Sequence, residues 1–396
     1  MDIPKKRIAL YTWKVFNQED IRDALEENGC IVDIYSEELR YTDKITGEVE
    51  HDCDRLCRDL SGYDAVFSLN FFSHLSNVCE KIGVKYIAWT IDSPLITLYD
   101  RAVYNDVNYI FIFDKVNYLE IKQMGVKKVF YLPLAVNEGR VSKLLQSDAD
   151  ERLLDILNNS DITFVGSLYE RNAYDDIYSS LSPYLRGYFD SVLELALNCP
   201  EVDILSESLT VEVLEKLLAS VDFKKDENAF SDLALVFRNT FLGFKLARME
   251  RIDRLNALSD YYRVSLFSDN HSEELGNTAQ YGQVSYLEEM PYIFNKSKIN
   301  LNMTIKNIRS GIPLRVWDVL GTGGFLLTNY QIEMSDFFND DEIAIYGSRE
   351  ELLYQAEYFM KHEDERETMA ANAHRKVKNM HTINHRVSEI LTKVYD

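Results

Sequence analysis

Short runs of β-branched and aromatic residues alternate with longer amphipathic stretches in the first third of the chain. These runs cover residues 8–11, 31–35, 65–69, 86–89, 109–113 and 129–132. Such alternation is typical of consecutive strand–helix–strand units, whose strands pair in parallel. Asn17 precedes an acidic first turn and Gly29 follows the last periodic position, as expected at the two ends of a helix. The pattern predicts a doubly wound, Rossmann-like domain at residues 1–140.

A second series of the same kind follows an acidic stretch at residues 146–155. Its predicted strands cover residues 162–165, 264–267, 283–285, 299–301, 325–328 and 343–346. The long interval between the first two has helical periodicity, so we predict a helical insertion at about 175–262 within a second Rossmann-like domain at 155–380. Helices are predicted at 349–361, 363–379 and 384–395. We expect residues 381–396 to form a helix that crosses back to the first domain.

The length, composition and net charge of the chain fit a two-domain α/β protein and exclude several kinds of partner. A chain of 396 residues exceeds what one hydrophobic core usually serves, and 46% of the residues are hydrophobic. The formal charge of -22 repels nucleic acid and anionic membranes, so we expect neither as a partner. Nothing approaches a membrane span, and the first residues lack the apolar run of a signal peptide. Five sparse cysteines also favour a reducing, cytoplasmic location.

One group of residues has the character of metal ligands. His51, Cys53 and Cys57 stand close together, but no second cluster of cysteine or histidine completes four ligands. The simpler interpretation is an amphipathic helix with two half-buried thiols. We therefore expect no metal site and no cofactor.

The most informative stretch begins with a Gly-Ile-Pro turn that opens a helix at Pro313. A helix start offers free backbone N–H groups and a positive dipole end, which suit a diphosphate. Arg309 and Arg315 would add charge-assisted hydrogen bonds. Asp318, about one turn beyond Arg315, could accept hydrogen bonds from a ribose diol. Taken alone, an arginine–carboxylate pair at this spacing is more often structural.

This stretch, with the segments at 341–346, 349–353 and 381–386, resembles the C-terminal signature of the CgeB-like spore-maturation glycosyltransferases. The shared pattern is Pro-x-Arg-x-aromatic-acid, a glycine-rich turn, Leu-Leu-Thr, and a final His-Thr followed by Arg. Segments 66–72, 86–94 and 132–136 resemble the domain commonly fused ahead of it. The resemblance implies a bacterial glycosyltransferase of the GT-B fold: two Rossmann-like domains face a cleft, the C-terminal domain binds a nucleotide-sugar, expected to be a UDP-sugar, and the acceptor faces the N-terminal domain.

By this resemblance Asp318 takes the place of the second glutamate in the paired-glutamate motif of retaining GT-B enzymes, which binds the donor ribose. The first glutamate falls at Ser310, a departure that leaves sugar recognition there open. Gly166 and Ser167 match a tight turn near the diphosphate, although glycines commonly end strands. Tyr286 lies where a base-binding loop is expected, although tyrosine is abundant here. The full expected donor set is Gly166, Ser167, Arg171, Tyr286, Asn302, Lys306, Arg309, Arg315, Asp318, Gly323 and Gly324.

Polar residues also follow the predicted strands of the first domain, where ligands of open α/β sheets collect. Asp92 is the candidate general base, since burial in a closed cleft raises carboxylate basicity, although Asp-Ser-Pro is also a plain turn signal. His74 is a candidate for hydrogen bonding to the sugar or a phosphate, with ordinary packing as the alternative. The expected catalytic set is Asp92, His74 and Arg315. The expected acceptor-side set is Asn70, Ser73 and Ser93.

The resemblance implies transfer with retention at the anomeric carbon. Because no Asp-x-Asp motif stands in a plausible loop, we expect the transfer to need no metal ion. The acceptor stays open among proteins, surface polymers and small molecules. Two alternatives remain: a non-catalytic nucleotide-sugar or glycan-binding protein of the same fold, and an epimerase. His381, His385 and Arg386 are expected mainly to fasten the last helix.

Overall fold

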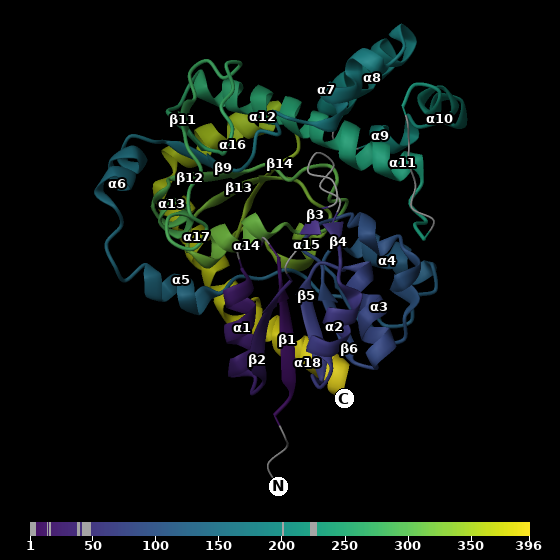
Figure 1. Ribbon diagram of the computed structural model, residues 1–396. Helices are drawn as coiled ribbons and strands as arrows, with labels where there is room; N and C mark the ends of the chain where they lie inside the picture. The colour runs from purple at the N-terminus through teal and green to yellow at the C-terminus, as the bar shows by residue number, and fades with distance from the viewer. Residues whose placement is uncertain are drawn as a thin grey trace. The chain divides into compact units, whose positions relative to one another are not determined.

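The computed structural model describes residues 5–13, 15, 17–37, 40–41, 49–199, 202–221 and 228–396. The chain forms two compact units. Unit 1 comprises Met1–Asn137, Asp226–Phe230 and His381–Asp396, and unit 2 comprises Glu138–Lys225 and Ser231–Met380. Each unit is built around a six-stranded sheet whose pairings are all parallel (Figure 1). Among the described residues, none of the helices combines the length and the apolar character needed to cross a bilayer.

The sheet of unit 1 has the order β2-β1-β5-β6-β7-β8. Ile8 of β1 lies opposite Val32 of β2 and Ala65 of β5. Strand β5 is buried along its whole length, and four of its five residues are hydrophobic, as is usual in parallel sheets covered on both faces. All six strands predicted for this half of the sequence are present. They are β1 Arg7–Thr12, β2 Ile31–Ser36, β5 Ala65–Leu69, β6 Lys85–Trp89, β7 Asn108–Ile112 and β8 Val129–Tyr131.

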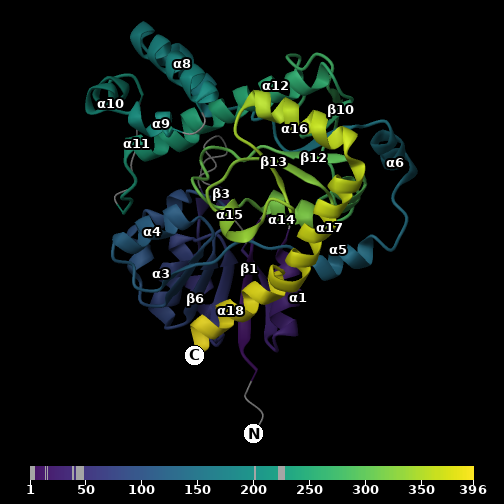
Figure 2. The same ribbon diagram turned by 180° about the vertical axis from the view of Figure 1, so that it is seen from behind.

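The helices of unit 1 include one from the end of the chain. Helix α18 (Ile383–Tyr395) packs against α1 (Gln18–Glu27), as the rear view shows (Figure 2). Nε of Arg386 in α18 donates to the backbone oxygen of Pro133 at 3.0 Å. Nη2 of the same guanidinium lies 2.8 Å from His381 Nδ1. The remaining elements are α2 Cys53–Leu60, α3 Ser73–Ile82, η1 Ile96–Leu98, η2 Arg101–Tyr104, α4 Lys115–Gln123 and a two-stranded ribbon of β3 Arg40–Tyr41 and β4 Val49–Glu50.

The sheet of unit 2 has the order β11-β10-β9-β12-β13-β14. One strand differs from its prediction: residues 283–285 form a loop, and the edge strand β11 is Ala279–Tyr281, which ends before Gly282. A short edge strand pairs on one side alone, so its apolar pattern is weak and its position is hard to find from sequence. The other strands are β9 Ile162–Val165, β10 Val264–Phe267, β12 Ile299–Asn302, β13 Leu326–Asn329 and β14 Ala344–Tyr346.

The predicted helical insertion lies between β9 and β10 and has a hydrophobic core of its own, which includes Tyr174, Phe189 and Phe237. Helix α12 (Phe244–Ser259) packs against both this core and the core of the sheet. Leu246 near the start of this helix belongs to the core of the insertion, whereas Leu255 belongs to the core of the sheet. The other elements of the insertion are α7 Ala173–Ile177, η3 Tyr178–Ser180, α8 Pro183–Asn198, α9 Ile204–Glu207, α10 Val211–Leu218, α11 Leu233–Val236 and the π-helix η4 Phe237–Gly243.

Further helices of unit 2 complete the layers on its sheet. They are α5 Glu138–Leu144, α6 Glu151–Asn158, α13 Met290–Lys296, α14 Leu314–Gly321, α15 Met334–Phe337, α16 Arg349–Lys361 and α17 Glu363–Met380. The strand order reverses between β9 and β12 in this unit and between β1 and β5 in unit 1. At such a switch point the loops after two neighbouring strands diverge and leave a crevice for ligands. The candidate residues are therefore best judged by their distance from these two points.

Candidate active site

Asp318 of α14 is the centre of a polar cluster in unit 2. Its Oδ1 accepts a 2.8 Å hydrogen bond from the hydroxyl of Tyr286, and its Oδ2 lies 3.3 Å from Nη1 of Arg315. The guanidinium of Arg315 also lies over the ring of Phe294, 5.0 Å from its centroid. Asp318 is 5% exposed, so its carboxylate is held in one orientation by charged and polar partners. Three residues predicted to bind the donor, Tyr286, Arg315 and Asp318, thus lie together.

Helix α14 begins directly beside this cluster. Its N-cap is Pro313, whose side chain makes no capping hydrogen bond. Backbone N–H groups that lack an intrahelical partner, together with the helix dipole, favour an anion at such an end. Lys306 and Arg309 lie in the segment between β12 and this helix. The half-buried position of both side chains leaves part of each in contact with solvent.

The loop after β9 lies at the switch point of the same sheet. A Cβ on Gly166 would stand 3.2 Å from the ring of Phe164, so a side chain there has little room. Ser167 accepts a hydrogen bond from the backbone N–H of Tyr169 at 3.1 Å. Arg251 of α12 donates to the backbone oxygen of Ser167 and, at 3.1 Å, to that of Met303 after β12. Arg251 therefore joins the two loops that flank the switch point.

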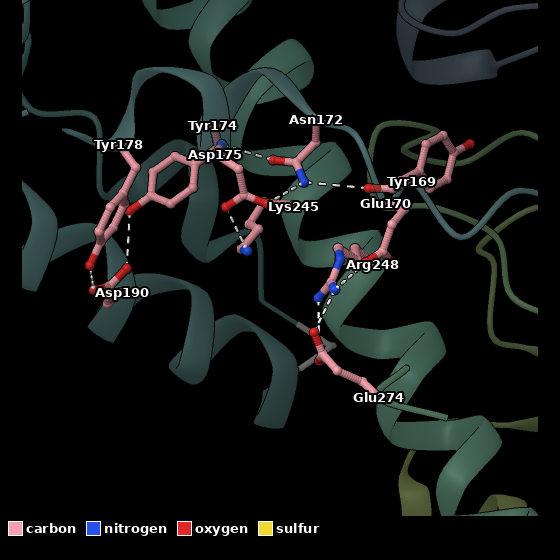
Figure 3. A network of polar contacts seen from close by, with 10 residues as sticks. All are labelled: Tyr169, Glu170, Asn172, Tyr174, Asp175, Tyr178, Asp190, Lys245, Arg248 and Glu274. Atoms are coloured by element: carbon pink, nitrogen blue, oxygen red, sulfur yellow. Dashed lines mark hydrogen bonds and ion pairs between the residues drawn. The ribbon is translucent and has the colours of Figure 1, made fainter. Parts of the chain in front are cut away.

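Figure 3 shows how this loop is tied to the insertion. Arg248 of α12 is 2.9 Å from Glu170 and 2.6 Å from Glu274, and its charge lowers the pKa of Glu274. Asn172 caps α7 through the backbone N–H of Asp175, whose carboxylate is 2.7 Å from Lys245. Further along, Tyr174 and Tyr178 both donate to Asp190. Arg171 lies within this anchored loop with its own side chain exposed.

Three predicted donor residues lie apart from the Asp318 cluster. Asn302 is buried, and its amide nitrogen donates to the hydroxyls of Thr304 and Thr328, both at 2.9 Å. Gly323 and Gly324 follow the last turn of α14, at the opposite end of the helix from Pro313. A Cβ on Gly324 would stand 2.2 Å from the backbone oxygen of Phe294. Close packing accounts for this glycine without a ligand.

A cavity of about 600 Å³ in unit 2 also lies at that far end of α14. Thr322, Gly323, Lys298 and Arg366 are among the residues that line it. These residues precede β12 and β13 or belong to α17, so the cavity is at the amino edge of the sheet. Ligands of doubly wound sheets bind at the carboxyl edge. We therefore place the candidate site at the Asp318 cluster.

Sequence reasoning missed two buried charged residues near this site. Glu333 accepts a 2.6 Å hydrogen bond from the hydroxyl of Ser310, and both side chains are almost fully buried. A carboxylate thus lies against the position where the paired-glutamate motif has its first acid. Arg251 is the second missed residue. Neither has a signal in local spacing, because Glu333 comes 23 residues after Ser310 and Arg251 lies in the insertion.

Two of the acceptor-side candidates in unit 1, Asn70 and Ser93, are each hydrogen-bonded to an aspartate. Asn70, with a positive φ of 65°, donates to Asp92 Oδ2 at 2.6 Å and accepts from the backbone N–H of Ile91 at 2.8 Å. Asp92 is exposed, so burial within this unit does not desolvate its carboxylate as the sequence argument required. Ser93 is buried and donates to Asp114 at 2.9 Å. Ser93 is thereby engaged in the fold itself.

His74 and Ser73 open helix α3. The ring of His74 stacks on that of His51 with centroids 3.5 Å apart, and its Nε2 lies 3.6 Å from the carboxylate of Glu37. Burial lowers the pKa of His74, an effect that the carboxylate of Glu37 opposes. His74 is therefore neutral near pH 7. Glu37 was not among the predicted residues.

Comparison with known proteins finds a family match in this part of the chain. Residues 248–392, which include the Asp318 cluster, match the protein family described as Glycosyl transferase-like. No curated protein resembles the chain closely enough in sequence to count as a match.

Solved structures resemble the whole chain. A glycosyltransferase from Rickettsia africae superposes with a TM-score of 0.56 at 9% identity over 100% of both chains. An E. coli trehalose-6-phosphate protein bound with UDP-2-fluoro glucose gives 0.57 at 11% identity, over 98% of this chain and 99% of that one. Anabaena HepE in complex with UDP-glucose gives 0.52 at 11% identity, over 98% and 99%.

At such low identity these structures establish the fold, which is the expected pair of Rossmann-like domains. The CgeB-like subtype has no match among them. The chain has the GT-B fold, and its residues 248–392 are similar to the family described as Glycosyl transferase-like.

Proposed function

We propose that the protein transfers a sugar from a UDP-sugar to an acceptor, with retention at the anomeric carbon and without a metal ion on the departing diphosphate. The observation that carries the proposal is the hydrogen-bonded cluster of Tyr286, Arg315 and Asp318 beside the start of α14. UDP-sugars are bound in solved structures of the same fold, which supports the choice of donor.

In this proposal each member of the cluster has a distinct task. Asp318 accepts hydrogen bonds from the ribose diol, and the hydroxyl of Tyr286 fixes the orientation of that carboxylate. Arg315 and the first N–H groups of α14 stabilise the negative charge that develops on the leaving phosphate. Lys306 and Arg309 add positive charge to the same region. This arrangement supplies cationic groups where other transferases use a divalent ion.

The acceptor side is proposed to be the loop pair of unit 1 that contains Asn70 and Asp92. The 2.6 Å hydrogen bond from Asn70 holds one carboxylate oxygen of Asp92 and leaves the exposed side chain able to contact an acceptor hydroxyl. With retention, the departing phosphate assists attack from the same face of the sugar. Asp92 then orients the acceptor, and its replacement reduces turnover more than donor binding.

Titration of the purified protein with UDP, combined with steady-state rates, tests these assignments. Asp318→Asn is expected to weaken UDP binding by roughly tenfold to hundredfold, since it removes charge-assisted hydrogen bonds of about 1.5–3 kcal/mol. Arg315→Ala is expected to lower kcat more than it weakens binding, because charge builds up in the transition state. Arg375→Ala, at an exposed position of α17, is the matched control.

Unchanged binding and turnover in both cluster variants, with unchanged melting temperatures, would remove the assignment. The metal-free step has its own test. Adding Mg²⁺ or Mn²⁺ is expected to leave the rate within twofold, and a rate that depends on either ion would contradict it.

The alternative is a protein of the same fold that binds a nucleotide-sugar or glycan without transfer. The serine at position 310 favours this alternative, because its hydroxyl is engaged by buried Glu333. Slow hydrolysis of the donor distinguishes the two functions. A transferase releases free sugar from the UDP-sugar it prefers, and this release falls in Arg315→Ala, whereas a binding protein releases none.

A further inference from the structure

Glu37, His51 and His74 place three metal-ligand side chains together in unit 1. Among the described residues, a carboxylate oxygen of Glu37 and one ring nitrogen of each histidine lie within 4.8 Å of one another. The three come from separate parts of the sequence: Glu37 directly follows β2, His51 precedes α2, and His74 lies in the first turn of α3. We propose that these residues bind a single divalent cation of the zinc class.

The distances suit such an ion. Glu37 Oε2 lies 3.0 Å from His51 Nδ1 and 3.6 Å from His74 Nε2. In a tetrahedral site with zinc–nitrogen bonds of about 2.0–2.1 Å, neighbouring ligand atoms are separated by about 3.3 Å. The two observed separations lie on either side of this value. The third separation, between the ring nitrogens of the two histidines, is at most 4.8 Å.

Two buried atoms of the cluster lack partners that an ion would supply. Glu37 Oε1 and His74 Nε2 are both inaccessible to solvent and make no hydrogen bond among the described residues. A buried polar atom without a partner costs about 1–3 kcal/mol, so such atoms are rare in folded proteins. The side chain of Glu37 is 6% exposed. A cation bound between these atoms removes the deficit.

The two imidazole rings lie next to each other beside the carboxylate. They are nearly parallel, at 9°, with centroids 3.5 Å apart. Binding of one ion by both rings therefore requires one ring to turn out of the stack, so that both lone pairs point at the same position.

A second layer of side chains holds the cluster in place. The hydroxyl of Tyr11 donates to Glu37 Oε2 at 3.1 Å, as outer partners of ligating carboxylates commonly do. Burial and the nearby carboxylate raise the pKa of Tyr11, so it stays a donor. The rings of Tyr11 and Phe72 pack edge-on against His74 at 6.0 Å and 5.8 Å.

Three protein ligands leave one tetrahedral position for water or a substrate atom, which is the usual arrangement of reactive zinc sites. The cluster follows β2 and β5, on the two sides of β1 at the switch point of this sheet. The sequence grouped His51 with Cys53 and Cys57 instead. Those cysteines are not members of the group, and its other two members are 14 and 23 residues from His51.

The test uses the full chain with its purification tag removed, stripped with a chelator and then titrated with Zn²⁺ in a calorimeter. We expect one ion per chain, a higher melting temperature with Zn²⁺, and a visible absorption band of four-coordinate type when Co²⁺ is added instead. Glu37→Gln and His51→Gln are each expected to weaken binding at least tenfold and to abolish the Co²⁺ band. His271→Gln, at an exposed histidine of unit 2, is the matched control.

A double Cys53→Ser, Cys57→Ser variant is expected to keep the stoichiometry and the band. Loss of the ion in this variant, or its retention in Glu37→Gln, would overturn the proposal. If a ligand variant melts far below the wild-type protein without metal, Tyr11→Phe is decisive, because it leaves all three ligands in place. It should weaken Zn²⁺ binding severalfold without eliminating it. UDP binding, measured in parallel, reports on the donor site alone.

Discussion

Gly324→Ala distinguishes packing from ligand binding at the end of α14. A Cβ at this position would stand 2.2 Å from the backbone oxygen of Phe294 and 2.9 Å from Asn300 Nδ2. Real Cβ contacts essentially never fall below 3.0 Å, so the carbonyl must withdraw by at least about 0.8 Å. That oxygen accepts the 2.8 Å hydrogen bond from Asn300, which also donates to Phe325. The alanine therefore disturbs α13 and the amino edge of the sheet together.

The expected cost has two parts. Overpacking in a close-packed interior costs about 1–3 kcal/mol, and each hydrogen bond of Asn300 that is lost adds about 0.5–1.5 kcal/mol. The free energy of unfolding of unit 2 should thus fall by about 2–5 kcal/mol. Gly323→Ala is the matched comparison: its φ is +77°, but its nearest neighbour, His374, stands 3.6 Å from the added Cβ. Its cost is that of a left-handed alanine, about 1–2 kcal/mol.

Urea unfolding and scanning calorimetry measure both variants, and calorimetric titration measures their UDP binding below the transition. We expect Gly324→Ala to be the less stable of the two, with UDP affinity within about twofold of wild type. Equal stabilities would refute the steric argument. A loss of UDP affinity at unchanged stability would instead indicate that Gly324 contributes to donor binding, as the family resemblance implies.

Three further predictions concern stability. Hydrogen bonds from Arg263 hold the pKa of Asp161 well below its usual 3.8, so Asp161→Asn should destabilise unit 2 by about 1 kcal/mol at pH 7. Because this contribution is lost as the pH falls below 3.8, the difference in free energy of unfolding between wild type and Asp161→Asn, measured by urea unfolding, should be smaller at pH 2.5 than at pH 7. A larger difference at pH 2.5 would contradict the prediction. Val387→Asp places a charge in the core of unit 1 and should remove the calorimetric transition of that unit while UDP binding by unit 2 persists. Ser310→Ala removes the 2.6 Å hydrogen bond to Glu333 and should cost about 1–3 kcal/mol by urea unfolding, whereas a neutral result would mean that this contact is not formed.

The features found from sequence are those encoded locally. Central strands such as β5 are mainly apolar because both faces are buried, and their bounds were predicted closely. Arg315 and Asp318 are three residues apart on one helix, so spacing alone brings them together. Tyr286 joined them through the family resemblance. Residues 283–285 were a wrong strand prediction, because an exposed edge strand has little pattern to read.

The features missed depend on contacts between distant parts of the chain. Arg251 reaches the loops after β9 and β12 from a helix of the insertion, whose approach to the sheet no local pattern encodes. Glu37 follows β2 and meets His74 only because β2 and β5 lie on either side of β1. Spacing along the sequence therefore grouped His51 only with the neighbouring cysteines. Asn302 is the last residue of β12, and its amide donates to the hydroxyls beside it.

Unit 1 is built from segments at both ends of the chain, so it cannot be completed until synthesis ends. All six strands of its sheet are synthesised before unit 2 begins, yet helix α18, with buried Val387 and Ile390, is made only after unit 2 is complete. Throughout that interval α1 lacks the helix that packs against it in the finished protein. The nascent first half thus exposes the surface that α18 later covers, a natural point of contact for chaperones that attend elongating chains.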